Sequence, residues 1–196
     1  MNTTKTRPRS VSHRSAPRTS MWRWIGFVAV PVSLAVLVAL STVSGTPDTA
    51  PGEAIDFELP TANGESVALA ETLAEGDTLL YFSMGVGCDG CFAQIPEIGQ
   101  AVAERGLSLL PIMVDPAPMV AAEASRFGID TPILIDGGAE VSQLYGMVGV
   151  YGHADRPSHS FALVRQDGSV GWVRHYAEMF VPSAALFAEL DRVLES

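Results

Sequence analysis

Cys88 and Cys91 are the only cysteines in the 196-residue chain, and two residues separate them. An apolar run, 79–83, precedes the pair, and a segment with apolar residues at helical spacing, 92–105, follows it. If a strand ends at the run and a helix begins at the pair, the i, i+3 spacing places both sulfurs on one face of the first helical turn, within disulfide reach. The pattern therefore predicts a dithiol that can be oxidised and reduced.

The two thiols are expected to play different roles. Unpaired backbone N–H groups and the positive end of the helix dipole would lie beside Cys88, and they can lower the pKa of a thiol well below its usual value of about 8.5. Cys88 is therefore the predicted nucleophile. Cys91, one turn deeper in the helix, would attack the mixed disulfide and release the substrate.

Two other uses of the cysteine pair remain open. A zinc site needs four ligands, and the chain has no second cysteine pair to supply them. A purely structural disulfide is the stronger of the two alternatives, although closing so short a loop constrains the unfolded chain little. We predict exchange chemistry at these sulfurs, with no metal and no cofactor.

The beginning of the chain indicates a compartment. Residues 1–23 hold six of the twelve basic residues, and no acidic residue occurs before Asp48. Residues 24–43 carry no charge and are long enough to cross about 30 Å of hydrocarbon as a helix. By the positive-inside tendency we predict a basic cytoplasmic tail, a single-pass anchor in the cell membrane and an extracytoplasmic remainder, where disulfides persist. A signal peptide cleaved after Gly45 is the alternative.

The remainder is predicted to be a Pro/Gly/Thr-rich linker, 44–52, and one domain of ordinary size, 53–196. From Thr46 onward the chain carries six arginines, no lysine and all 22 acidic residues, which gives a formal charge of −16. Such an acidic coat argues against nucleic acid and anionic lipid surfaces as partners of the domain.

Five short apolar runs predict strands, and the first three are continuous, as expected when both faces of a strand are covered. These runs are residues 79–83, 107–114, 133–135, 161–164 and 170–173. Helices are predicted at residues 92–105, 119–127, 139–145 and 183–194. A hairpin turn is predicted at residues 166–168. The order β-α-β-α-β-α-β-β-α predicts an α/β sandwich with parallel strands first and an antiparallel hairpin last.

Residues 81–98 resemble the active-site segment of thioredoxin-fold proteins, especially the membrane-tethered bacterial thiol-disulfide oxidoreductases of the TlpA-like or redoxin group, which is related to AhpC/TSA proteins. Pro96, eight residues after the first cysteine, matches that segment particularly well. Weaker similarities to the group's later strands and hairpin lie at residues 131–136, 145–147 and 161–168. The resemblance covers residues 52–194 and implies a thioredoxin-like sandwich with a central mixed sheet.

The resemblance also implies functional residues besides the cysteines. Thioredoxin-fold enzymes present a cis-proline opposite the dithiol, and the candidate here is Pro157, which stands one residue further upstream of Phe161 than in the usual pattern. TlpA-like members often carry an acidic residue where this chain has Gln94, so His159 is the expected substitute for handling a proton of the dithiol. A partly exposed loop histidine is the alternative interpretation. Asp89 is expected to oppose part of the dipole's effect on the first thiol.

The activity implied by the resemblance is the exchange or reduction of disulfides in exported proteins, with apocytochrome c as one substrate class and a membrane thiol carrier as electron donor. A peroxiredoxin-like thiol peroxidase is one alternative. Peroxiredoxins share a Pro-x-x-x-Thr-x-x-Cys motif, and this chain has Tyr81, Gly85 and Cys88 at its three defined positions. A thioredoxin-fold copper-binding chaperone that uses two cysteines and a histidine is the other alternative.

Overall fold

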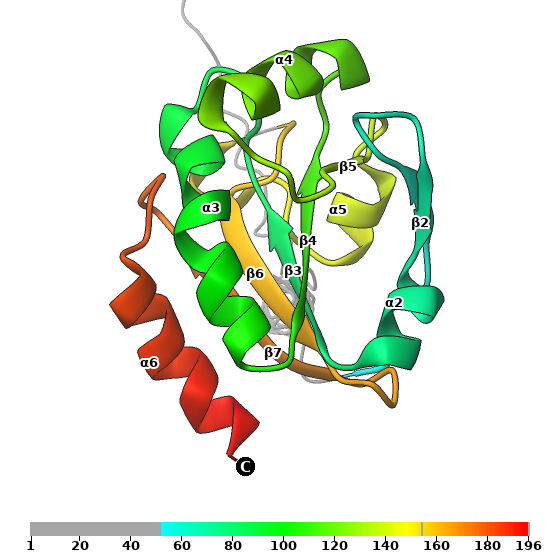
Figure 1. Cartoon of the computed structure of the whole chain (residues 1–196), viewed down its shortest axis with the longest axis vertical. Coiled ribbons are helices and arrows are strands. Elements are labelled where there is room, and N and C mark those ends of the chain that lie inside the picture. The colour runs from blue at the N-terminus through cyan, green and yellow to red at the C-terminus, as the bar shows by residue number, and fades with distance from the viewer. Residues whose placement is uncertain (1–51, 154, 196) are drawn as a thin grey trace, which may run out of the picture. The chain divides into compact units, whose positions relative to one another are not determined.

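The computed structural model describes residues 52–153 and 155–195, and a mixed sheet of five strands runs through their centre (Figure 1). The strands are β3 (Thr78–Phe82), β4 (Ser108–Met113), β5 (Leu134–Ile135), β6 (His159–Val164) and β7 (Val170–Tyr176). Their order across the sheet is β5-β4-β3-β6-β7. The pairs β3–β4 and β4–β5 are parallel, whereas β3–β6 and β6–β7 are antiparallel.

Strand β3 lies in the middle of the sheet, and all five of its residues are buried. Because side chains alternate along a strand, Leu79 and Tyr81 contribute to one hydrophobic core, and Leu80 and Phe82 contribute to the other. This double burial explains why the strand is a continuous apolar run rather than an alternating one.

Helices cover both faces of the sheet (Figure 1). The face with Tyr81 packs against α3 (Asp89–Glu104), α4 (Ala117–Phe127) and α6 (Ser183–Leu194). The opposite face packs against α2 (Leu69–Glu75), α5 (Glu140–Leu144) and a two-stranded hairpin of β1 (Glu58–Pro60) and β2 (Ser66–Ala68). A single 3-10 turn, Val150–Gly152, precedes β6.

The predicted fold class and element order are confirmed. Each predicted strand and helix is present, and its ends lie within three residues of their predicted positions. The predicted hairpin turn is also present, because the N–H of Gly168 donates to the carbonyl of Arg165. β1, β2 and α2 are absent from the elements predicted from the sequence. The two strands have three residues each and α2 has seven, which is too short for a clear periodic pattern.

Among residues 52–153 and 155–195, no helix has both the length and the apolar composition needed to cross a membrane. The predicted basic tail, the anchor at 24–43 and all but the last residue of the linker lie outside the described residues.

The topology brings three loops together at one edge of the sheet. β3 and β4 are parallel, so the loops that follow Phe82 and Met113 leave from the same edge. β6 is antiparallel to β3 and pairs Ser160 with Phe82, so the loop that enters β6 reaches that edge too. The two cysteines belong to the first of these loops and to the helix that it enters.

Candidate active site

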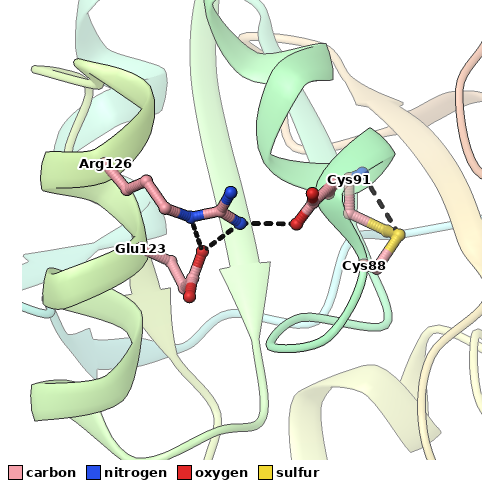
Figure 2. A network of polar contacts seen from close by, with 5 residues as sticks. Cys88, Cys91, Glu123 and Arg126 are labelled. Carbon is pink, nitrogen blue, oxygen red and sulfur yellow. Dashed lines mark hydrogen bonds and ion pairs between the residues drawn. A yellow bond between two sulfur atoms is a disulfide. The ribbon is translucent and has the colours of Figure 1, made fainter.

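Cys88 and Cys91 form a disulfide at the start of α3, and their Cα atoms are 5.3 Å apart. Cys88 is the N-cap residue of the helix, and its Sγ accepts a hydrogen bond of 3.2 Å from the backbone N–H of Cys91 (Figure 2). The predicted placement of the pair at a helix start is therefore confirmed. A thiolate at Cys88 would have a backbone donor and the positive end of the helix dipole beside it.

The two cysteines differ in exposure. Cys88 retains 5% of its surface exposed, whereas Cys91 is completely buried. An incoming sulfur atom can therefore reach only the first of the two. This asymmetry matches the expected division into an attacking and a resolving thiol.

Glycines shape the approach to the dithiol. Gly85 and Gly87 have φ angles of +82° and +96°, and the N–H of Cys88 closes a turn by donating to the carbonyl of Gly85 at 3.1 Å. A side chain at position 85 would collide with the carboxylate of Asp115. A Cβ on Gly90 would lie 2.6 Å from the carbonyl oxygen of Met179, so the segment after β7 packs directly on the dithiol turn.

An ion pair balances the charge of Asp89. Arg126 on α4 donates to Asp89 and also to Glu123, one turn earlier on the same helix (Figure 2). The hydrogen bond from the guanidinium lowers the pKa of Asp89. Asp89 was expected to oppose part of the dipole's effect on Cys88, and its pairing with Arg126 offsets part of that opposing charge. The contact joins residues 37 positions apart, which sequence spacing does not reveal.

A second ion pair, Asp115–Arg156, lies under the loop that leads to Cys88. Asp115 follows β4 and is 4% exposed, and Nη1 of Arg156 donates to both of its carboxylate oxygens at 2.9 and 3.0 Å. The same Nη1 donates to the carbonyl of Met84 at 2.9 Å. The carboxylate also accepts the N–H of Val86 at 2.8 Å. Neither Asp115 nor Arg156 was among the site residues predicted from the sequence.

Pro157 is buried beside this ion pair, but it is not a cis-proline. All peptide bonds among the described residues are trans. Pro157 forms an isolated antiparallel bridge with Val148, and the N–H of the following Ser158 donates to the carbonyl of Met147 at 3.1 Å. The resemblance implied a cis-proline at this position, and the structure shows a trans-proline instead. Pro157 stands one position further upstream than the usual proline, in extended backbone that pairs with residues 147 and 148.

His159 is the first residue of β6 and is completely buried, so its interpretation as a partly exposed loop residue is wrong. Its Nδ1 lies 3.1 Å from the hydroxyl of Tyr81, which donates to the carbonyl of Cys91 at 3.1 Å. Burial lowers the pKa of His159 to about 4, so the imidazole is neutral near pH 7. A histidine that passes a proton to the dithiol near pH 7 would need a pKa close to neutrality, which this burial does not give it. The histidine touches the dithiol helix through Tyr81.

Gln94 stands where TlpA-like proteins often carry an acidic residue, and here it links two segments of the fold. Its side chain is fully buried on α3, and its Oε1 accepts the N–H of Val181 at 2.7 Å. The bond ties α3 to the segment that leads into α6. His175, on β7, contacts the hydroxyl of Ser160 at 2.8 Å, on the sheet face opposite Tyr81. Gln94 and His175 make no direct contact with the cysteines among these hydrogen bonds, which leaves His159 as the histidine nearest to the dithiol helix through Tyr81.

The copper-chaperone alternative needs a third ligand close to the two cysteines. Within residues 52–153 and 155–195, no cluster of three or more His, Cys, Asp or Glu side chains could hold a metal ion. His159, at the start of β6, places its Nδ1 against the Tyr81 hydroxyl.

The sequence of residues 51–173 matches the AhpC/TSA family. The chain belongs to that family. It is 26% identical over 122 residues to the thiol-disulfide oxidoreductase ResA of Halalkalibacterium halodurans. That match covers 60% of this chain and 64% of the relative, so the chain spans less than two thirds of the relative's length. The resemblance to the redoxin group is confirmed.

Solved structures show the same thioredoxin-like fold. The peroxidoxin BcpB of Mycobacterium tuberculosis has a TM-score of 0.61 at 24% identity, covering 74% of this chain and 96% of that protein. The thiol peroxidase of Chromobacterium violaceum has a TM-score of 0.59 at 18% identity, covering 72% of this chain and 85% of that protein. At these identities the similarity concerns the fold alone.

Two residues of the peroxiredoxin motif, the proline and the threonine, are replaced here by Tyr81 and Gly85. The contacts of both replacements leave no room for the motif's residues. Gly85 packs on Asp115 with a positive φ, so the threonine of the peroxiredoxin motif would overlap the carboxylate. Tyr81, in place of the motif's proline, is fully buried and uses its hydroxyl against both Cys91 and His159. The site retains the reactive cysteine and lacks the two other residues of that motif.

Proposed function

We propose that this protein is a thiol-disulfide oxidoreductase that exchanges or reduces disulfides of exported proteins. The observation that supports this most strongly is the arrangement of the two sulfurs: Cys88 caps α3 and keeps a small exposed surface of 5%, and Cys91 is completely buried one turn below and bonded to it. The arrangement suits a two-step exchange, and the ResA-type relative carries the same kind of activity in its name.

In the proposed cycle the Cys88 thiolate attacks one sulfur of a substrate disulfide. The substrate S–S bond breaks, its second sulfur leaves as a thiolate that takes a proton from water, and Cys88 remains in a mixed disulfide. Cys91 then loses its proton and attacks the Cys88 sulfur, which releases the second substrate thiolate. The substrate gains two electrons, and the protein ends as the Cys88–Cys91 disulfide seen in the structure.

A dithiol donor has to reduce that disulfide before the next turnover. We propose a membrane thiol carrier as the donor, and an extracytoplasmic domain held to the cell membrane through residues 24–43 as the arrangement in which the two meet. The uncharged length of that segment and the basic residues before it support this topology. Apocytochrome c cysteines remain one proposed substrate class.

A thiol peroxidase is the second candidate, because the AhpC/TSA match and both peroxidase structures favour it at the level of family and fold. In a peroxidase cycle Cys88 would instead attack the O–O bond of a peroxide, become a sulfenic acid and release an alcohol or water, and Cys91 would then form the disulfide with loss of water. The residues at positions 81 and 85 weigh against this candidate, as described above.

Turnover with each oxidant separates the two candidates. The full chain, supplied with dithiothreitol, is expected to reduce a protein disulfide such as that of insulin and to consume hydrogen peroxide no faster than dithiothreitol alone. Cys88→Ser should abolish the disulfide activity, and Arg192→Gln, at the far end of α6, should retain it. Fast peroxide consumption without disulfide reduction would overturn the proposal, as would full disulfide activity in Cys88→Ser.

A further inference from the structure

The loop that delivers Cys88 rests on the Asp115–Arg156 ion pair. Met84 and Val86 are each hydrogen-bonded to one member of the pair, and Gly85 between them packs on the carboxylate so closely that no side chain fits. These contacts join the loops after β3 and β4 to the loop before β6. Pro157 fixes the last of these loops by its bridge to Val148, and thereby holds Arg156 in reach. The position of the dithiol turn is therefore set by a pair of opposite charges.

The negative charge of the Asp115 carboxylate is compensated mainly by Arg156, because the carboxylate has little contact with solvent. Asp115 is 4% exposed, while the side chain of Arg156 keeps 37% of its surface in solvent. Removing Arg156 would leave the buried Asp115 carboxylate uncompensated where solvent screens it poorly, whereas removing Asp115 would leave a guanidinium that solvent screens in part. Val86 precedes Cys88 by only two residues, so their Cα atoms lie within about 7 Å. A charge left behind at Asp115 or Arg156 would consequently act on a thiolate at Cys88.

We propose that Asp115 and Arg156 are positioning residues of Cys88, and that their balance of charge sets the fraction of Cys88 present as thiolate. The pair holds the loop in place as a unit while adding almost no net field at the sulfur. The proposal rests on the proposed function only in taking Cys88 as the attacking sulfur, since the reactivity of a thiol can be measured without turnover.

Other charged or titratable groups surround the dithiol and belong to the same electrostatic balance. They are Asp89 on α3, Glu123 and Arg126 on α4, Tyr81 on β3 and His159 on β6. Asp89 is paired with Arg126, and burial keeps Tyr81 and His159 uncharged near pH 7 by raising the pKa of the former and lowering the pKa of the latter. The Asp115–Arg156 pair is the closest to the loop that precedes Cys88, to which it is directly bonded.

The expected size of the effect follows from Coulomb's law. A unit charge about 8 Å from a thiolate changes the thiolate fraction about twofold at the dielectric constant of water, and about thirtyfold at the effective value near a protein surface. Arg156→Gln leaves the negative charge of Asp115 and should lower the fraction. Asp115→Asn leaves the positive charge of Arg156 and should raise it. The double variant removes both charges and should return close to the parent.

The experiment measures the rate of alkylation by iodoacetamide against pH in the reduced full chain, with Cys91→Ser in every variant so that Cys88 is the single thiol. Asparagine at 115 keeps an oxygen that can accept the Val86 N–H, whereas glutamine at 156 is shorter than arginine and loses the direct bond to the Met84 carbonyl, so the Arg156→Lys variant controls for charge and Tm is measured for every variant to detect a loosened loop. Arg156→Lys, which keeps the charge, should titrate like the parent. Arg192→Gln removes an arginine near the end of α6 and should also titrate like the parent.

We expect the alkylation rate of Cys88 below pH 7 to change severalfold in each single variant, and in opposite directions. The double variant and Arg156→Lys should react at nearly the parent rate. Displacements in the same direction would mean that the variants merely loosen the loop, and they would overturn the proposal. Unchanged titrations in both single variants would overturn it as well. Neither result depends on disulfide reduction, so a failure of the proposed function would appear separately, as loss of insulin reduction by the parent chain.

Discussion

Gly85 should be required for two separable reasons, and the neighbouring Gly87 offers a matched control. Both glycines have positive φ angles, +82° and +96°. A Cβ on Gly85 would collide with Asp115, whereas a Cβ on Gly87 would meet no atom within 4 Å. Gly87→Ala therefore adds backbone strain alone, and Gly85→Ala adds the same strain together with overlap in a packed site.

The magnitudes can be worked from these two contributions. A left-handed backbone costs a non-glycine residue about 1–2 kcal/mol. Overlap in a well-packed site costs about 1–3 kcal/mol more. Gly87→Ala should thus lose about 1–2 kcal/mol of unfolding free energy, and Gly85→Ala about 2–5 kcal/mol. For a domain of this size each kcal/mol lowers Tm by about 2–4 °C.

Thermal unfolding of the oxidised full chain, followed by circular dichroism, measures the difference. Gly85→Ala is expected to have the lower Tm of the two, by about 2–12 °C. Equal Tm values for the two variants would refute the reasoning, because they would show that Asp115 can move aside and that the contact with Gly85 does not fix the loop.

Three further predictions concern pH, salt and topology. Burial lowers the pKa of His159 to about 4, so the unfolded chain binds the extra proton and stability should fall, by at most about 3 kcal/mol, as the pH drops from about 6.5 toward 4. His159→Asn should flatten this part of a urea-unfolding pH profile, and an unchanged slope would contradict the assignment. Arg126→Gln should raise the pKa of Asp89 and slow alkylation of Cys88 more at low ionic strength than at high; salt-independent slowing would rule out the electrostatic explanation. A phosphatase fused after Ser196 should be active outside the cytoplasm, and the fusion protein should stay in the membrane fraction after carbonate washing. Recovery of the fusion protein in the soluble fraction, with a new N-terminus near Thr46, would instead establish a cleaved signal peptide.

Much of the fold could be predicted because its signals are local. The strand at 78–82 is a continuous apolar run, and α6 begins and ends where its helical spacing does. The dithiol was also readable from sequence, since two cysteines at i, i+3 before a helical segment have few other uses. The hairpin of β1 and β2 was missed because strands of three residues have no readable period.

The surroundings of the dithiol could not be predicted, because they depend on contacts between distant residues. Val86 meets Asp115 across 29 positions, Met84 meets Arg156 across 72, and Tyr81 meets His159 across 78. One usable signal was present: Arg156 immediately precedes Pro157, the proline that the family resemblance placed near the active site. His159 was correctly placed near the dithiol, but its burial, and with it the lowered pKa, requires the packing of β6 against β3.

The most direct test of the central claim is to identify the bond that forms when Cys91→Ser meets a disulfide substrate. The reduced full-length variant is mixed with insulin, quenched with acid and analysed by mass spectrometry after proteolysis under non-reducing conditions. The account predicts an accumulated mixed disulfide whose protein-side cysteine is Cys88, because the resolving thiol is gone. Failure to accumulate any adduct, while the variant still reduces insulin as fast as the parent, would contradict it.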